Sequence, residues 1–382
     1  MSEVKLGDIG KISMCKRILK SQTNEVSGIP FYKISTFGGI ADVFIDEAIF
    51  NEYKEKYSYP KKGDILISAA GTVGKTIIYN GEDAYFQDSN IVWIDNNEKI
   101  VTNQYLYYFY QTNPFVSTNG STIKRLYNDN IRETKIKNVP SIEDQNRVTK
   151  VLEYLDQKIA LNNQINEELE AMAKTLYDYW FVQFDFPDEN GNPYKSSGGK
   201  MVYNDQLKRE IPEGWGVENL SYFLTIKNGK DHKDLSDGDY PVYGSGGLMR
   251  KVDDYIFEGE SVLIPRKGTL NNIMYVDEKF WTVDTMFYTH MKIENSALYS
   301  YYSIKDIDFT KLNTGTGVPS MTSSILYQLQ ILNPNADILQ KFDESVRHSY
   351  RMIFDNCKQN QELTQLRDWL LPMLMNGQVK VD

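Results

Sequence analysis

The sequence predicts an α+β protein made of two similar, mostly β domains, each followed by a long helix, with the two helices paired as an antiparallel coiled coil about an approximate two-fold axis. Three observations support this fold class: an internal duplication, an apolar stripe after each copy, and a turn-rich segment between the copies. The chain of 382 residues has room for two or three domains. The predicted segments are a first domain over 1–141, a central helix over 142–183, a linker over 184–215, a second domain over 216–333, and a distal helix with a C-terminal tail over 334–382.

The duplication is visible as matching stretches in the same order. "GDILISAAGTVG" (63–74) resembles "GESVLIPRKGTLN" (259–271), since each has a glycine and an acidic residue, an apolar strand, and a turn containing Gly-Thr. "AYFQDSNIVW" (84–93) similarly matches "KFWTVDTMFY" (279–288). From Pro140 and Pro334 onward, the copies keep a constant offset of 194 residues. Such regular self-similarity indicates two copies of one structural unit.

After each domain, apolar residues recur at steps of three and four, the spacing of a coiled-coil seam. Asparagines occupy equivalent seam positions in both helices, where buried amides can fix register and partner. The residues expected to pair the helices are Leu152, Leu155, Ile159, Asn162, Asn166, Leu169, Phe342, Val346, Ile353, Asn356, Asn360 and Leu363. Alternatively, each stripe packs only on its own domain. Pairing is favoured because about 40 residues at roughly 1.5 Å rise make a rod near 60 Å, longer than a small domain covers.

Composition restricts the classes of function. The net charge is −10, and the acidic excess lies outside residues 1–141, so any basic face must be local. No apolar run approaches the roughly 20 residues of a membrane helix, which predicts a cytoplasmic protein. The two cysteines, Cys15 and Cys357, and the three histidines lack metal-binding spacing, so no metal site is predicted. No nucleophile motif of a hydrolase is present, which leaves few ways to build a hydrolase on this chain.

The stretch "SAAGTVGKTIIY" (68–79) matches the loose pattern of a phosphate-binding loop, so a P-loop-type nucleotide-binding protein is one alternative. A phosphate-binding loop needs a helix directly after its Lys and Thr. Here β-branched and aromatic residues follow, and then Asn80-Gly81, a hairpin signal. The second copy keeps the Gly-Thr turn without the Gly-Lys-Thr. We therefore interpret the stretch as a β-hairpin that presents Thr72 and Lys75.

Three further stretches carry a resemblance to a known family. They are "SIEDQNRVTKVLEYLDQKI" (141–159), "FPDENGNPYKSSGGKMVYNDQLKREIPEGW" (186–215) and "LRDWLLPMLMNGQVKV" (366–381). Together with "GDILISAAGTVG" and the duplicated plan, they make the chain resemble the specificity subunit of type I restriction-modification systems. The resemblance covers essentially the whole chain.

The resemblance implies separate roles for the globular halves, the helices and the partner subunits. The globular halves would be target-recognition domains, each reading one half of a split sequence in double-stranded DNA, and the paired helices would set the unread gap. The helices would also dock two methyltransferase subunits that use S-adenosylmethionine, and restriction subunits driven by ATP with magnesium would complete the complex. The chain itself would be a non-catalytic subunit without a cofactor of its own. A coiled-coil adaptor that does not contact DNA is the second alternative.

Candidate DNA contacts are basic, amide and hydroxyl side chains on predicted loops, because such groups bond phosphates and base edges. In the first domain they are Lys33, Ser35, Thr72, Lys75, Lys124 and Arg125; in the second they are Ser245, Arg266, Lys267, Thr269, Asn271, Thr316 and Ser320. Arg125 and Arg266 are the expected guanine readers, since arginine can bond O6 and N7 together.

The aromatic residues are expected to divide between core and surface. The tyrosine-rich tracts at 105–110 and 297–302 have the spacing of core segments. Tyr177, Tyr179 and Trp180 are candidates for partner contact on an outward helix face, with core packing as the alternative for Trp180.

Overall fold

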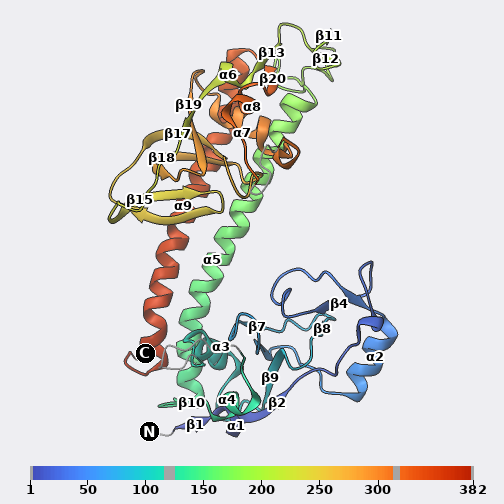
Figure 1. The fold of residues 1–382 in the computed structure, drawn as a ribbon, viewed down its shortest axis with the longest axis vertical. Helices are drawn as coiled ribbons and strands as arrows, with labels where there is room; N and C mark the ends of the chain where they lie inside the picture. Colours follow the sequence, from blue (N-terminus) through green and yellow to red (C-terminus); the bar gives the residue numbers. More distant parts are fainter. Residues whose placement is uncertain (1–2, 116–124, 313–318, 380–382) are drawn as a thin grey trace. The chain divides into compact units, whose positions relative to one another are not determined.

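The computed structural model describes residues 3–115, 125–312 and 319–379 (Figure 1). By their internal contacts, the residues form two compact units. Unit 1 comprises residues 1–162 and 358–382, and unit 2 comprises residues 163–357. Both units share the two long helices, α5 (Ile142–Tyr177) and α9 (Ala336–Met375). The division falls within the helices because each half-helix packs on a different globular domain.

Unit 1 contains two small β-sheets. The first has the strand order β2-β9-β6-β7 and the second has the order β3-β5-β4-β8, while β1 pairs with β10. The bounds of the strands are β1 (Val4–Lys5), β2 (Gly10–Ser13), β3 (Thr23–Asn24), β4 (Ile29–Tyr32), β5 (Phe44–Ile45), β6 (Ile65–Ser68), β7 (Thr76–Ile78), β8 (Tyr85–Phe86), β9 (Ile91–Asn96) and β10 (Lys135–Ile136). The helical segments are α1 (Leu6–Ile9), η1 (Lys20–Gln22), α2 (Glu47–Lys56), α3 (Asn103–Gln111) and α4 (Asn128–Glu133).

The first sheet of unit 1 is buried on both faces. Ile65 and Ile67 of β6 belong to one core cluster with Tyr105 of α3, whereas Leu66 belongs to another with Trp93. Alternate side chains of a strand point to opposite faces, so a continuous apolar run is what a doubly covered strand requires. The expectation that the tract at 105–110 is core is confirmed for its tyrosines at 105, 108 and 110, which are buried.

Unit 2 contains a six-stranded sheet with the order β14-β19-β17-β18-β15-β16, and two pairs of strands, β11 with β12 and β13 with β20 (Figure 1). The bounds of the strands are β11 (Met201–Asn204), β12 (Arg209–Pro212), β13 (Gly216–Asn219), β14 (Leu224–Asn228), β15 (Asp237–Gly244), β16 (Gly247–Val252), β17 (Phe257–Pro265), β18 (Met274–Thr282), β19 (Met286–Met291) and β20 (Gln330–Asn333). The helical segments are the π-helical turn η2 (Asp178–Val182), α6 (Leu220–Phe223), α7 (Ala297–Lys305), η3 (Phe309–Leu312) and α8 (Ser323–Tyr327).

The two units share one strand plan, which confirms the predicted duplication. The order β2-β9-β6-β7 in unit 1 corresponds to β14-β19-β17-β18 in unit 2, and the pair β1-β10 corresponds to β13-β20. The parallel pair β4-β8 corresponds to the parallel pair β15-β18. The difference is that unit 2 has one long strand, β18, where unit 1 has two short strands, β7 and β8. The strands that form two sheets in unit 1 therefore form a single sheet in unit 2.

The long helices run antiparallel wherever they contact each other. In unit 1, Asp156 of α5 bonds Arg367 of α9 at 2.9 Å, and Asn162 Nδ2 donates to Asn360 Oδ1 at 2.8 Å. Rising numbers on α5 therefore meet falling numbers on α9. Of the remaining predicted pairing residues in unit 1, Leu152 is buried, and three are half-buried, namely Leu155, Ile159 and Leu363.

Unit 2 continues the same antiparallel pattern. Asn356 Nδ2 donates to Asn166 Oδ1 at 2.9 Å, and the ring of Phe342 lies 5.9 Å from the ring of Trp180. The predicted seam asparagines thus bond one another in amide pairs. Of the predicted pairing residues in unit 2 other than the asparagines, two are buried, Phe342 and Val346, and two are half-buried, Leu169 and Ile353.

Residues 184–215, expected to form a linker, are folded onto unit 2. Phe186 stacks between Tyr194 at 4.7 Å and Trp215 at 4.9 Å, and Ile211 of β12 is buried. Turn-forming composition indicated a boundary, but the aromatic residues spaced through the segment supply enough apolar surface to hold it on a core.

Candidate nucleic-acid interface

The turn between β6 and β7 has hairpin geometry. The two strands pair antiparallel, and Ser68 N donates to Lys75 O at 2.8 Å. Gly71 and Gly74 adopt φ of 67° and 86°, the left-handed region in which glycine is favoured. The strand β7, rather than a helix, follows Lys75, so the predicted hairpin is confirmed and the helix N-terminus of a phosphate-binding loop is missing from this described segment.

Lys75 is held by the neighbouring loop. Its Nζ donates to the carbonyl oxygen of Phe37 at 2.6 Å. Thr72 is exposed at the tip of the hairpin, and its carbonyl oxygen accepts a bond from the hydroxyl of Ser68. The hairpin and the loop at 33–39 therefore form one surface of unit 1.

Three segments of unit 1 converge at this turn. The backbone N–H of Ala69 donates to Asn90 O at 2.7 Å, and the N–H of Leu126 donates to Ala69 O at 2.8 Å. Arg125 forms an isolated bridge with Ala70. These bonds bring the end of β6, the loop before β9, and the segment after residue 124 to one place.

Unit 2 repeats the arrangement bond for bond. The N–H of Arg266 donates to Thr285 O at 2.8 Å, and the N–H of Met321 donates to Arg266 O at 2.8 Å. Lys267 forms an isolated bridge with Ser320, in the way that Ala70 does with Arg125. Gly268, with φ of 89°, takes the place of Gly71. Four predicted residues of the second domain thus lie together: Arg266, Lys267, Thr269 and Ser320.

The cations occupy different positions on these two matching frames. In unit 1 the arginine, Arg125, is on the third segment, where unit 2 has Ser320. In unit 2 Arg266 and Lys267 are on the first segment, where unit 1 has alanines. Two interfaces with one backbone plan and different placement of donors can recognise different base patterns.

The two predicted guanine readers both anchor on the loop that precedes the strand β9 or β19. The Arg125 guanidinium donates to the carbonyl and hydroxyl oxygens of Ser89, each at 3.2 Å. Arg266 Nη1 is 3.5 Å from the carbonyl oxygen of Asp284, and its guanidinium lies 6.0 Å from the ring centre of Phe287. These contacts with the loop before β9 or β19 orient each arginine side chain. The role of each arginine as a guanine reader stays a prediction.

The remaining candidates are more varied in their surroundings. Lys33 Nζ pairs with Asp42 at 2.9 Å, while Ser35 is exposed. Ser245 accepts a bond from Asn272 Nδ2 at 2.9 Å through its carbonyl, which links it to the turn at 266–272. Asn271 Oδ1 accepts from the N–H of Phe309 at 2.9 Å and so has a structural role in its loop. Lys124 and Thr316 lie outside the described residues.

Two cations that the sequence analysis did not select lie beside Lys33. Arg17 and Lys20 line a cavity of about 700 Å³ together with Lys33 and Gln87. Arg17 is paired with Asp88 at 3.7 Å. The closely spaced cations of the stretch 16–20 are the signal in the sequence that could have identified them.

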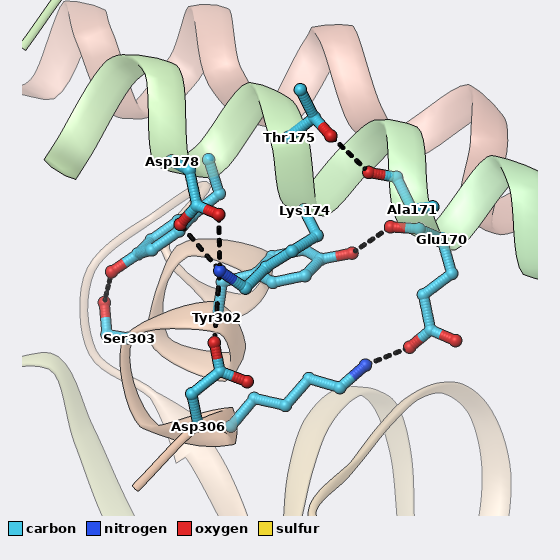
Figure 2. Close-up of polar contacts among 10 residues, drawn as sticks. Glu170, Ala171, Lys174, Thr175, Asp178, Tyr302, Ser303 and Asp306 are labelled. Atoms are coloured by element: carbon cyan, nitrogen blue, oxygen red, sulfur yellow. Dashed lines mark hydrogen bonds and ion pairs between the residues drawn. The ribbon is translucent and has the colours of Figure 1, made fainter. Parts of the chain in front are cut away.

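In unit 2, a polar cluster attaches α7 to α5 (Figure 2). Lys174 Nζ lies 2.6 Å from Asp178 Oδ1 and 3.1 Å from Asp306 Oδ2. Glu170 pairs with Lys305 and accepts a bond from the hydroxyl of Tyr301 at 3.1 Å. These contacts fix α7, and with it the sheet that α7 covers, on the helix.

Unit 1 contains a simpler version of this attachment. The hydroxyl of Tyr108 on α3 donates to Asp156 Oδ2 at 2.8 Å, and Arg367 bonds the other oxygen of Asp156 at 2.9 Å. A tyrosine from the domain, a carboxylate on α5 and a neighbouring cation therefore recur in both units. A bonded tyrosine–carboxylate pair is directional, so it orients the domain on the helix as well as attaching it.

The expectation of an outward face at the end of α5 is wrong for Tyr177, and for Trp180 the alternative of core packing is confirmed. The hydroxyl of Tyr177 donates to Ser303 Oγ at 3.2 Å, and its ring stacks on Tyr302 at 5.5 Å. Trp180 is 6% exposed and packs in the core, and Tyr179 is half-buried against the same core. The helix here faces its own domain, because α7 and α9 cover it on two sides.

Two further properties follow from the residues that the structure describes. Across the ranges 3–115, 125–312 and 319–379, no group of three or more His, Cys, Asp and Glu side chains is placed to hold a metal ion. Within the same described ranges, every helix is too short or too polar to span a membrane.

Comparisons with known proteins agree with this plan. The family model of the type I restriction modification DNA specificity domain matches residues 1–171 and 212–349. A Haemophilus influenzae protein, S.HindORF215P, which carries the name of a type I restriction enzyme specificity subunit, is 51% identical over 180 residues; the match spans 46% of this chain and 46% of that protein. The MjaIX specificity subunit of Methanocaldococcus jannaschii is 27% identical over 84% of this chain and 78% of its own length.

A solved structure shares the fold. The S subunit of a type I restriction-modification system from M. genitalium has a TM-score of 0.61 at 14% identity, covering 98% of this chain and 95% of that one. The family model matches more than half of the chain, in two stretches that correspond to the two duplicated units. The chain belongs to the family of type I restriction-modification specificity subunits, with two target-recognition domains.

Proposed function

We propose that this chain is the DNA-reading subunit of a type I restriction-modification complex, in which each target-recognition domain contacts one half of a bipartite sequence. The observation that carries the proposal is the repeated convergence of three segments, with Arg125 in one domain and Arg266 and Lys267 in the other. Cations on a shared frame would position the domain on phosphates and present donors to base edges. The chain itself would perform no chemistry.

We further propose that the outer surfaces of the helices dock two methyltransferase subunits and, through them, restriction subunits. S-adenosylmethionine, ATP and magnesium would be bound by those partners. Family membership supports this assignment. The helices would then hold the two recognition domains at a set separation, and the segment of DNA between the half-sites would go unread.

A domain exchange tests the reading function. The chain is co-expressed with its cognate methyltransferase subunit, and methylated adenines are mapped across the host genome. Replacing residues 1–141 by those of a relative is expected to change one half of the methylated motif and leave the other half unaltered. Because α9 also packs in the core of unit 1, a second chimera that exchanges residues 358–382 as well controls for misfolding. A motif changed in both halves, or methylation that does not depend on this chain, would refute the modular reading and favour an adaptor.

A helix insertion tests the spacing function. A heptad inserted in α5 after Asn162, matched by a heptad in α9 before Asn360, keeps the apolar stripe on the same face. Seven residues lengthen a helix by about 10 Å, so the unread gap is expected to widen by about three base pairs at roughly 3.4 Å per step. The gap is read from the same methylation maps. An unchanged gap in a folded, active variant would contradict the role of the helices as a spacer.

A further inference from the structure

Each recognition domain carries an exposed aliphatic side chain directly after a Gly-Gly turn. Ile40 follows Gly38 and Gly39 and is 91% exposed, and Leu248 follows Gly246 and Gly247 and is 47% exposed. Single exposed aliphatic residues are common on protein surfaces and require no function by themselves. Ile40 and Leu248 differ from other exposed aliphatic residues because each follows a turn that contacts a candidate DNA-binding turn.

In unit 1 the Gly-Gly turn rests against the Gly-Thr hairpin. A Cβ at Gly38 would lie 2.9 Å from Lys75 Nζ, and the same Nζ bonds the carbonyl of Phe37. Gly38 also has φ of 72°, a backbone conformation that favours glycine. Ile40 therefore follows a turn that lies against Lys75 of the hairpin.

Unit 2 has the same juxtaposition. A Cβ at Gly268 would lie 2.8 Å from Ser245 Oγ, and Ser245 O accepts the bond from Asn272. The turn between β15 and β16, which Leu248 follows, thus touches the turn that carries Arg266 and Lys267. The two domains have their charged residues at different positions here, whereas both have an aliphatic residue after Gly-Gly.

A β-bulge adds apolar surface in unit 2. Tyr243 pairs with Leu248 and Val242 pairs with Arg250, which leaves Met249 as the extra residue of β16. Met249 is 56% exposed. Bulges re-aim side chains at functional edges of a sheet, and here the bulge keeps a second apolar group at the exposed end of the hairpin.

We propose that Ile40 and Leu248 press against nucleobases of their respective half-sites, an inference that rests on the proposed DNA-reading function. Lys75 lies at the Gly-Gly turn of unit 1, and Arg266 and Lys267 are on the turn that the Gly-Gly turn of unit 2 touches. These cations favour DNA over an apolar protein surface, because they complement phosphate charge. An aliphatic group can meet a base through a thymine methyl in the major groove, or by entering an opened base step. Both modes use the apolar part of a nucleobase.

The test uses the complex of the full chain with its cognate methyltransferase subunit and a duplex containing the motif found by methylation mapping. Ile40→Ser and Leu248→Ser are each expected to weaken the measured Kd about tenfold at fixed salt, the effect of losing one good base contact. Val26→Ser and Tyr203→Ser are matched controls, since these side chains are 87% and 62% exposed at other sites. Their Kd is expected to stay within about twofold of the wild type.

Modified DNA separates the two modes of contact. If a thymine methyl is the contact, uracil in place of thymine in one half-site will weaken the wild-type complex and leave the matching serine variant unaffected. If a base step is opened, 2-aminopurine fluorescence will rise on wild-type binding and fail to rise with the variant. Serine variants that bind DNA like the wild type overturn the inference. A serine variant that no longer binds the methyltransferase subunit but keeps its DNA affinity would assign the residue to protein docking, and this result would also overturn the inference. If methylation mapping of the wild-type complex finds no bipartite motif, the proposed DNA-reading function itself is wrong.

Discussion

Replacing Arg347 with methionine will lower the free energy of unfolding of unit 2 by about 3 kcal/mol at neutral pH, because it leaves the buried carboxylate of Asp343 without a counter-charge. Arg347 Nη2 bonds Asp343 at 2.7 Å and Glu260 at 3.1 Å, and Asp277 lies 4.0 Å from Nη1. The side chain of Asp343 is 2% exposed. Methionine keeps the helix and the length of the side chain but removes every donor. Chemical denaturation followed by hydrogen exchange will measure the loss unit by unit.

The pH dependence identifies the cause of this loss. Burial raises the pKa of Asp343 above its ordinary value of 3.8, and the bond from Arg347 opposes that rise. Without Arg347 the folded carboxyl will bind its proton more tightly than the unfolded one. An acid with a raised folded pKa costs stability above that pKa, so the deficit will shrink as pH falls through it.

Two variants serve as controls for the Arg347 prediction. Arg351→Met, on an exposed position of the same helix, is expected to change stability by less than about 0.5 kcal/mol. Adding Asp343→Asn to Arg347→Met removes the buried charge and should recover part of the loss at neutral pH. If Arg347→Met is as stable as the wild type, or if its deficit grows on acidification, the ion cluster does not act as described.

Replacing Leu374 with alanine will destabilise unit 1, although this residue lies near the C-terminal end of the chain. Leu374 is 2% exposed and belongs to the core cluster of the first domain together with Leu371 and Met375. The hydroxyl of Tyr105 also donates to Met375 O at 3.3 Å. A buried leucine shortened to alanine loses apolar contact and leaves a cavity, at a cost of about 2–4 kcal/mol.

Hydrogen exchange will show where the effect of Leu374→Ala falls. Protection should decrease in peptides from residues 3–115 and 125–162 and stay unchanged in residues 163–312. Leu366→Ala is the matched control, because Leu366 is on the same helix and 43% exposed. Equal loss of protection in both units would show that the C-terminal segment does not belong specifically to the first domain.

Local patterns in the sequence were enough to predict much of the fold. The Gly-Thr turn with its β-branched flank predicted the hairpin of β6 and β7, and the asparagines at equivalent seam positions predicted that they would lie between the two helices; the structure shows which of them pair, Asn162 with Asn360 and Asn166 with Asn356. Both depend on periodicity and turn chemistry within short windows, which a single sequence displays. The duplication added long-range information, because two copies of one pattern require two similar domains.

The sequence by itself therefore determined the duplicated plan, the antiparallel helices and the family to which the chain is similar. Only the tertiary structure decided which side chains meet: Lys75 with the carbonyl of Phe37, Arg125 with Ser89, and Tyr177 with α7 rather than a partner. It also divided each long helix between two domains. The physical reason is that these contacts join residues far apart in the chain, and their partners depend on how strands and helices pack, which no periodicity within one segment encodes.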